Sequence, residues 1–208
     1  MAYRLAIFDF DGVLADSAPW FLEQLPGLAL RHRFSSPDAD EIARLRNLPT
    51  REIMKALGVS PLKMPGIAAD LRSRMASDRQ SIRLFDAVPE MLGHLHGRDV
   101  CIAIVSSNSE ENVRAILGSS ASFVSLFSCG AALLGKSRRF VSLLRRTGLQ
   151  PREACAIGDE VRDIEAARKA GMPAVAVTWG YAATEALISA APDYVARSPA
   201  DVTGFLLA

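Results

Sequence analysis

Four short apolar runs are spread along the chain, and each of them ends in polar residues. They are rich in isoleucine, valine and alanine and lie at 3–10, 100–105, 154–157 and 174–178. Their apolar residues follow one another without alternating with polar ones, which is typical of strands buried on both faces of a parallel sheet. The pattern therefore predicts four strands of one parallel sheet.

Helical periodicity follows most of these runs. The clearest example is 160–170, where apolar residues recur at helical spacing and Asp159 stands at the expected N-cap. Ser109 is suited to cap a second helix, and 89–97 and 137–147 give two more. Strands that alternate with helices predict a doubly wound α/β fold with a parallel sheet.

One stretch breaks this alternation. Residues 17–84 contain no strand pattern, and helices fit 18–25, 38–46, 50–57 and 65–79. The Pro26-Gly27 pair is expected to break or kink the first of them. We therefore expect a small, all-helical cap domain at 17–84, inserted after the first strand into a core domain made of 1–16 and 85–208.

Composition and charge narrow the class of protein. The chain has 208 residues, half of them hydrophobic, and its 24 basic and 23 acidic side chains leave a net charge of +1. This balance is that of a globular protein and argues against a nucleic-acid partner. No apolar stretch approaches the ~20 residues of a membrane span, and Asp9 and Asp11 interrupt the apolar N-terminus. We expect a cytoplasmic protein with no membrane partner.

Polar side chains gather where the predicted strands end. In open α/β sheets, ligands bind at the carboxyl ends of the strands, so these side chains are expected to meet at one rim. The set consists of Asp9, Asp11, Ser106, Ser107, Asn108, Asp159 and Asp163, together with Lys136 beside Gly135 at the start of a helix.

This set suits the chemistry of phosphate esters. Clustered carboxylates repel one another unless a cation is present, and Mg²⁺ prefers carboxylates, waters and a substrate phosphate. Lys136 and the Ser106 hydroxyl suit phosphate oxygens. Asp9 can attack phosphorus, and Asp11, two residues on, can protonate the leaving oxygen and then deprotonate the hydrolytic water. The sequence therefore predicts a magnesium-dependent site for a small phosphate ester.

Two motifs carry a resemblance to a known family. Phe8–Ser17 (FDFDGVLADS) and Gly158–Ile164 (GDEVRDI) resemble the first and fourth motifs of the haloacid-dehalogenase-like (HAD) hydrolase superfamily. Ser106 and Lys136 fall where the family has its Ser/Thr and its Lys. The resemblance covers essentially the whole chain and implies a Rossmann-like core with a helical cap, of the phosphoglycolate phosphatase and β-phosphoglucomutase kind.

The resemblance also implies a role for each residue. Asp9 would be the nucleophile that forms an aspartyl-phosphate, and Asp11 the general acid and base. Mg²⁺ would be held by Asp9, the backbone carbonyl of Asp11 and Asp159, with Asp163 ordering the ion's surroundings. The residues expected to contact the substrate are Gly12, Ser106, Ser107, Asn108, Lys136 and Arg51.

The cap is expected to set the substrate, and there the pattern is less specific. Arg51, in a polar turn that opens a helix, is a candidate for binding a carboxylate or a second phosphate, although a surface arginine near a helix start is the commoner case. Many relatives have a proline after the Lys, whereas Ser137, Arg138 and Arg139 follow here. This difference alters the loop that places Lys136.

Four functions remain open at this point. The first is a phosphatase of a small metabolite such as phosphoglycolate, and the second is a phosphomutase that returns the phosphate to a bound sugar phosphate. The third is a 2-haloacid dehalogenase; such enzymes generally lack the second Asp, so Asp11 counts against it. The fourth is a non-enzymatic binding module, which the intact polar set disfavours. We take the phosphatase as the prediction.

Overall fold

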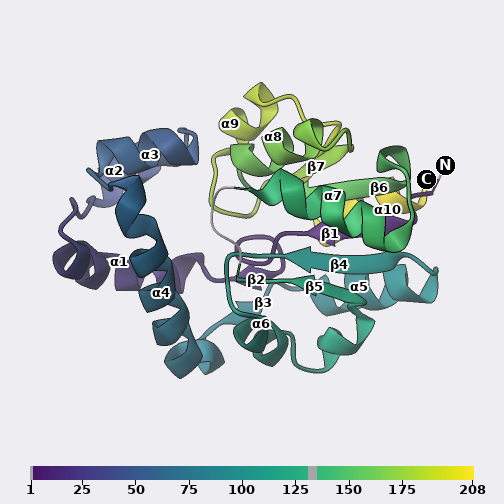
Figure 1. The fold of residues 1–208 in the computed structure, drawn as a ribbon, viewed down its shortest axis with the longest axis horizontal. Helices are drawn as coiled ribbons and strands as arrows, with labels where there is room; N and C mark the ends of the chain where they lie inside the picture. The colour runs from purple at the N-terminus through teal and green to yellow at the C-terminus, as the bar shows by residue number, and fades with distance from the viewer. Residues whose placement is uncertain (1, 131–134) are drawn as a thin grey trace.

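The core of the molecule is a six-stranded parallel sheet. We describe residues 2–130 and 135–208 of a computed structural model. The strands lie in the order β5-β4-β1-β6-β7-β8 (Figure 1). Their bounds are β1 Leu5–Phe8, β4 Cys101–Val105, β5 Leu126–Ser128, β6 Ala154–Gly158, β7 Ala174–Val177 and β8 Tyr194–Ala196. Strand β1 is paired in parallel with β4 on one side and β6 on the other. Residues that follow these three strands therefore lie side by side at the carboxyl ends of the central strands, and we call this end of the sheet the polar edge.

Helices cover both faces of this sheet, which confirms the doubly wound fold. Alternate strand residues point to opposite faces, so Ala6 and Phe8 pack in one apolar cluster and Leu5 and Ile7 in another. The first cluster lies under α5 (Val88–Gly97), α6 (Glu110–Leu117) and α10 (Pro199–Leu207), and the second under α7 (Lys136–Thr147), α8 (Val161–Lys169) and α9 (Thr184–Ser189).

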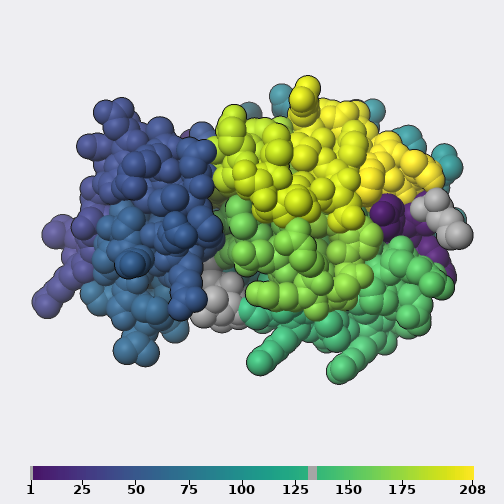
Figure 2. All heavy atoms as spheres, turned by 90° about the horizontal axis from the view of Figure 1, so that it is seen from above, coloured from purple at the N-terminus to yellow at the C-terminus, as the bar shows by residue number. Residues whose placement is uncertain are grey.

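Four further helices make up the insert that follows β2, called the cap below, which lies beside the end of the sheet that carries the polar residues (Figure 1). They are α1 Ala18–His32, α2 Ala39–Leu45, α3 Thr50–Ala56 and α4 Met64–Asp78. The chain enters and leaves this insert through a short antiparallel pair, β2 (Ala15–Asp16) and β3 (Arg83–Leu84). The expectation that 17–84 contains no strand is therefore wrong at its last two residues, because pairing with β2 fixes a strand too short to show a pattern of its own. Figure 2 shows the insert as a separate lobe, in blue, against the rest of the molecule.

Short 3₁₀ helices complete the fold, at Pro61–Lys63, Arg79–Ser81, Gly118–Phe123 and Pro151–Glu153. Within 2–130 and 135–208, no helix has the length and apolar character needed to cross a membrane.

The expected break at Pro26-Gly27 is wrong. Helix α1 continues through Pro26 to His32. Proline removes only one backbone donor, and the buried stripe of Leu25, Leu28 and Ala29 runs across this position. A Cβ at Gly27 would lie 3.3 Å from a guanidinium nitrogen of Arg74, so glycine lets α4 approach α1 closely here.

The expected N-cap of α8 is also wrong. Glu160 is the N-cap, and its backbone N–H donates to Asp163 Oδ2 at 3.2 Å. Asp159 follows β6 directly, and its side chain accepts a hydrogen bond from a different segment, the backbone N–H of Tyr181. The Asp159 carboxylate is therefore available to a site at the sheet edge.

Candidate active site

Asp9 lies at the centre of the polar edge. It is the first residue after β1, and its backbone N–H donates to the Ile157 carbonyl of β6 at 2.9 Å, which extends the sheet by one step. Its Oδ1 accepts from the backbone N–H of Phe10 at 2.8 Å, and its Oδ2 lies 2.7 Å from Lys136 Nζ. The side chain is buried, so its position is fixed by the strand and by these two contacts.

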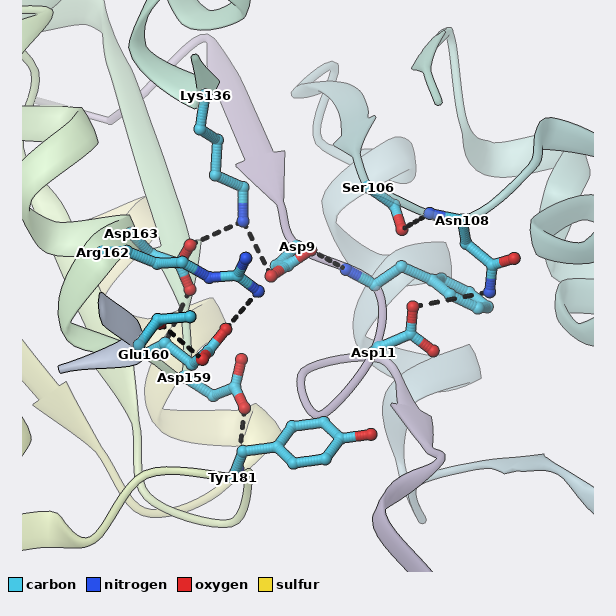
Figure 3. Close-up of polar contacts among 12 residues, drawn as sticks. Asp9, Asp11, Ser106, Asn108, Lys136, Asp159, Glu160, Arg162, Asp163 and Tyr181 are labelled. Carbon is cyan, nitrogen blue, oxygen red and sulfur yellow. Dashed lines mark hydrogen bonds and ion pairs between the residues drawn. The ribbon is translucent and has the colours of Figure 1, made fainter. Parts of the chain in front are cut away.

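Lys136 joins two carboxylates. It begins α7 after Gly135, whose φ of 113° is in the region that favours glycine, and its Nζ lies 2.6 Å from Asp163 Oδ1 as well as near Asp9 (Figure 3). Desolvation alone would lower the pKa of Lys136, but Asp163 and Asp9 raise it. Lys136 in turn lowers the pKa of Asp163 against the effect of burial. The ammonium and the Asp163 carboxylate therefore both stay charged.

The Asp159 carboxylate occupies space that is open because residues 12 and 180 are glycines. Its Oδ2 accepts from the Tyr181 N–H at 2.7 Å, and a Cβ on Gly12 or Gly180 would collide with its carboxylate. Gly12 also has a φ of 80°, so two constraints require glycine there. Burial, followed by the charges of Glu160, Asp163 and Asp9, raises the pKa of Asp159 well above its ordinary value.

This carboxylate cluster fits a divalent cation. Asp9, Asp159 and Asp163 each offer one oxygen, and these atoms lie within 4.8 Å of one another. Among the described residues, two buried carboxylate oxygens lack any hydrogen-bond partner, Asp159 Oδ1 and Asp11 Oδ1. An unpaired buried oxygen is costly, and a hard cation with oxygen ligands in this cluster would satisfy Asp159 Oδ1. The three aspartates could therefore hold Mg²⁺.

Asp11 follows Asp9 by two residues, and its side chain points toward Asn108 (Figure 3). Burial and the charge of Asp9 raise the pKa of Asp11 to about 6, although hydrogen bonds from Ser17 and Asn108 act in the opposite direction. A carboxyl group with such a pKa can both give and take a proton near neutral pH.

The loop after β4 brings three of the expected residues to the same edge. Ser106 is buried, and its Oγ accepts from the Asn108 backbone N–H at 3.0 Å. Asn108 Nδ2 lies 3.5 Å from Asp11 Oδ2, and Arg72 of α4 donates to the Ser107 carbonyl at 3.2 Å. The loop is thus held by the core on one side and by the cap on the other.

A cavity of about 710 Å³ lies between the cap and this edge. Its core end is polar, with Asp11, Ser107 and Asn108, and its cap end is lined mainly by apolar residues of α1 to α4. Arg51 is exposed on α3 and is not among the lining residues, so the structure does not bring it to the site. The arginines that line the cavity are Arg46, Arg72 and Arg162.

Sequence reasoning missed a half-buried ion pair and a loop that lie at the site. Glu160 and Arg162 form an ion pair at the cavity, and Thr50 Oγ1 donates to Glu160 Oε1 at 3.2 Å. Both charged residues belong to the GDEVRDI motif, which was a signal that they lie at the site. Tyr181 comes from the loop after β7, and nothing in the local pattern marked it.

The family follows from a comparison with known proteins. The family model described as "Haloacid dehalogenase-like hydrolase" matches residues 6–177. The chain belongs to this family. It is 35% identical over 198 residues to the phosphoglycolate phosphatase of Synechococcus elongatus, covering 94% of this chain and 93% of the relative. It is 30% identical over 193 residues to the phosphoglycolate phosphatase of Xylella fastidiosa, covering 88% and 83%.

A solved structure confirms the HAD fold. A haloacid dehalogenase-like family hydrolase from Streptococcus pneumoniae superposes with a TM-score of 0.79 over 98% of both chains. The sequence identity is 22%, so this likeness concerns the fold alone. The chain is thus a HAD hydrolase that resembles phosphoglycolate phosphatases in sequence and has the fold expected from its motifs.

Proposed function

We propose that this HAD hydrolase is a Mg²⁺-dependent phosphatase that hydrolyses a small phosphorylated metabolite through an aspartyl-phosphate. One observation carries the proposal: Asp9, Lys136, Asp159 and Asp163 lie together at the sheet edge, and Asp11 lines the adjoining cavity. The edge thus combines a buried carboxylate, an ammonium and an acid with a pKa of about 6.

In the first step, Asp9 attacks the phosphorus of the bound ester. An oxygen–phosphorus bond forms to Asp9, the bond to the leaving oxygen breaks, and Asp11 gives that oxygen a proton. Lys136 and Ser106 would bind the phosphate oxygens. When bound, Mg²⁺ would neutralise the carboxylate and phosphate charges that otherwise oppose this attack.

In the second step, water removes the phosphoryl group. Asp11, now a carboxylate, takes a proton from the water as its oxygen attacks phosphorus, and the bond from phosphorus to Asp9 breaks. Inorganic phosphate leaves, and both aspartates return to their starting states. The leaving alcohol occupies the cavity next to Asp11, so the cap residues are the ones that would select it.

The substrate proposed first is 2-phosphoglycolate. Two relatives named phosphoglycolate phosphatase support it. A carboxylate on the leaving group needs a cation in the cavity, and Arg46, Arg72 and Arg162 line it. Arg51, the candidate from the sequence, lies outside this set.

The domain division also remains a proposal. We propose that 17–84 is a cap that moves against the core of 1–16 and 85–208. Support comes from the β2–β3 pair, which brings the two ends of the insert together: Ala15 and Asp16, the last residues before it, pair with Leu84 and Arg83, its own last residues.

The test is phosphate release from a panel of phosphorylated metabolites. The panel contains 2-phosphoglycolate, sugar phosphates and esters of larger alcohols, since the cavity of about 710 Å³ exceeds the size of phosphoglycolate. Each compound is assayed with Mg²⁺, with EDTA, and with Asp9→Asn as the control for contaminating phosphatases. The proposal expects Mg²⁺-dependent release that Asp9→Asn abolishes. Transfer of phosphate to a bound sugar phosphate instead of water would favour the mutase.

A further inference from the structure

The loop of residues 179–183 encloses Asp159. Tyr181 N–H donates to Asp159 Oδ2 at 2.7 Å, and Ala182 N–H approaches the Asp159 carbonyl at 3.4 Å. At Gly180 the backbone passes so close that a Cβ would collide with the Asp159 side chain. Among the described residues, the Asp159 carboxylate accepts a hydrogen bond only from the backbone of this loop. Its other oxygen, Oδ1, has no partner and is free to bind a cation.

Arg46 of the cap holds the same loop from the other side. It follows α2 directly, and its Nε donates to the Tyr181 carbonyl at 2.8 Å while a terminal nitrogen donates to the Gly180 carbonyl at 3.1 Å. The Arg46 carbonyl accepts from the Ala183 N–H at 2.8 Å. Arg46 thus fixes the loop by three hydrogen bonds, two donated by its side chain and one accepted by its backbone carbonyl. The two donated bonds are geometrically specific because both loop carbonyls meet one planar guanidinium.

Tyr181 adds a second link between the loop and the cap side. Its hydroxyl shares a hydrogen bond of 3.0 Å with Ser17 Oγ, at the start of the insert, and its ring packs edge-on against Phe21 of α1 with 5.9 Å between the ring centres. The loop therefore contacts α1 and the α2–α3 turn at once. Undocking the cap would break these contacts and release the loop.

We propose that Arg46 is a positioning residue that couples docking of the cap to the placement of the Asp159 carboxylate. The proposal rests on the proposed function, because Asp159 is taken there as a ligand of Mg²⁺. Such a coupling is reciprocal: a docked cap raises the affinity for Mg²⁺, and bound Mg²⁺ favours the docked cap by the same factor. The cap would thus complete the metal site as it closes over the substrate.

Arg46 is itself solvent-exposed, so its effect on the Asp159 site can be measured separately from its effect on the stability of the whole protein. Hydrogen bonds from an exposed side chain contribute little to the free energy of unfolding. Arg46→Ala should therefore leave the melting temperature nearly unchanged. Its effect should appear in the loop and at Asp159.

The first experiment is hydrogen exchange in the metal-free protein. It compares the wild type with Arg46→Ala and with Arg79→Ala, which removes a different link between cap and core, the 3.3 Å ion pair to Glu111. The proposal expects faster exchange of the Tyr181 and Ala183 amides in Arg46→Ala only. Equal protection of these amides in the wild type and Arg46→Ala would overturn it, as would the same loss in both variants.

The second experiment is calorimetric titration with Mg²⁺ alone. Because residues that orient a metal ligand commonly contribute about 10–100-fold to metal affinity, Arg46→Ala should bind Mg²⁺ about 10-fold more weakly than the wild type. Arg46→Lys can keep one of the two carbonyl contacts and should fall between them. Arg79→Ala should bind as the wild type does.

The two experiments distinguish failure of the inference from failure of the proposed function. A wild-type protein that binds Mg²⁺ no better than Arg46→Ala does would overturn the coupling while leaving the phosphatase intact. A wild-type protein that does not bind Mg²⁺ at all would overturn the proposed function and the coupling to metal with it. In that case hydrogen exchange still decides whether Arg46 holds the loop.

Discussion

Replacing Lys136 with methionine tests what holds the metal-free site together. The ammonium lies 2.7 Å from Asp9 and 2.6 Å from Asp163, and 14% of its side chain is exposed. At an effective dielectric constant of about 20, an ion pair at such a distance has a Coulomb energy of about 6 kcal/mol, much of which is offset by desolvation of the ions. Removing one partner leaves the carboxylates unpaired, so we expect a loss of about 3–5 kcal/mol in the free energy of unfolding.

This loss should depend on pH in a defined direction. Asp163 and Asp9 raise the pKa of Lys136 against desolvation, so the ammonium is present at every pH below about 10. The pKa of Asp163 is lowered, so its part of the stabilisation is present above about pH 4 and is lost as the pH falls through the lowered pKa. The wild type and Lys136→Met should differ most near neutral pH and converge in acid.

The assay is urea unfolding followed by circular dichroism, in EDTA, near pH 7.5 and near pH 3, which lies below the ordinary pKa of an aspartate carboxyl group, about 3.9. The control is Lys169→Met in the last turn of α8, an exposed lysine whose removal should change the free energy of unfolding by no more than about 0.5 kcal/mol. Equal stability of the two variants near neutral pH would refute the reasoning, because it would mean that the carboxylates need no cation in the metal-free protein.

Three further variants test other parts of the account. Asp11→Asn should slow the hydrolysis of alkyl phosphates far more than that of p-nitrophenyl phosphate, whose leaving group hardly needs a proton; equal losses in kcat would argue against an acid role. Arg51→Ala should leave KM for the preferred substrate unchanged, since Arg51 is exposed and outside the cavity lining; a raised KM would place it at the site after all. Asp70→Asn should lower the free energy of unfolding by about 1 kcal/mol near pH 7. Although desolvation opposes it, hydrogen bonds from Arg74 and His32 lower the pKa of Asp70, so this difference should fade below about pH 4 in thermal unfolding.

The core of the fold could be predicted because uninterrupted apolar runs and helix ends carry strong local signals. The runs at 100–105 and 154–157 became β4 and β6, and Ser109 caps α6 through its Oγ as expected. Strands of two or three residues, such as β2, β3 and β5, are too short to show periodicity. Their conformation depends on the strands that they pair with, and the sequence does not show which segments are paired.

The course of α1 illustrates how packing overrides a local signal. Proline and glycine together predict a break, yet the helix continues because its buried stripe crosses that position and glycine gives α4 room. Local propensity was therefore a poor guide where two cap helices lie close together.

The candidate site, like the fold, could be predicted only in part from the sequence. Residues within motifs, such as Asp9 and Asp159, lie at the expected edge because parallel strands end together there. Arg46 and Tyr181 lie outside these motifs in the sequence: Tyr181 reaches Asp159 through the loop after β7, and Arg46 reaches that loop through the docked cap. Arg51 and Arg46 are five positions apart, and only the structure distinguishes the one that faces the core.

The most direct test of the central claim is to find the phosphoryl group on Asp9. Wild-type protein is mixed with Mg²⁺ and the best substrate of the panel, quenched in acid during turnover, and digested for mass spectrometry. The account predicts a peptide that carries one phosphoryl group on Asp9, and neither this peptide nor turnover in Asp9→Asn. Near-normal phosphate release by Asp9→Asn would contradict it.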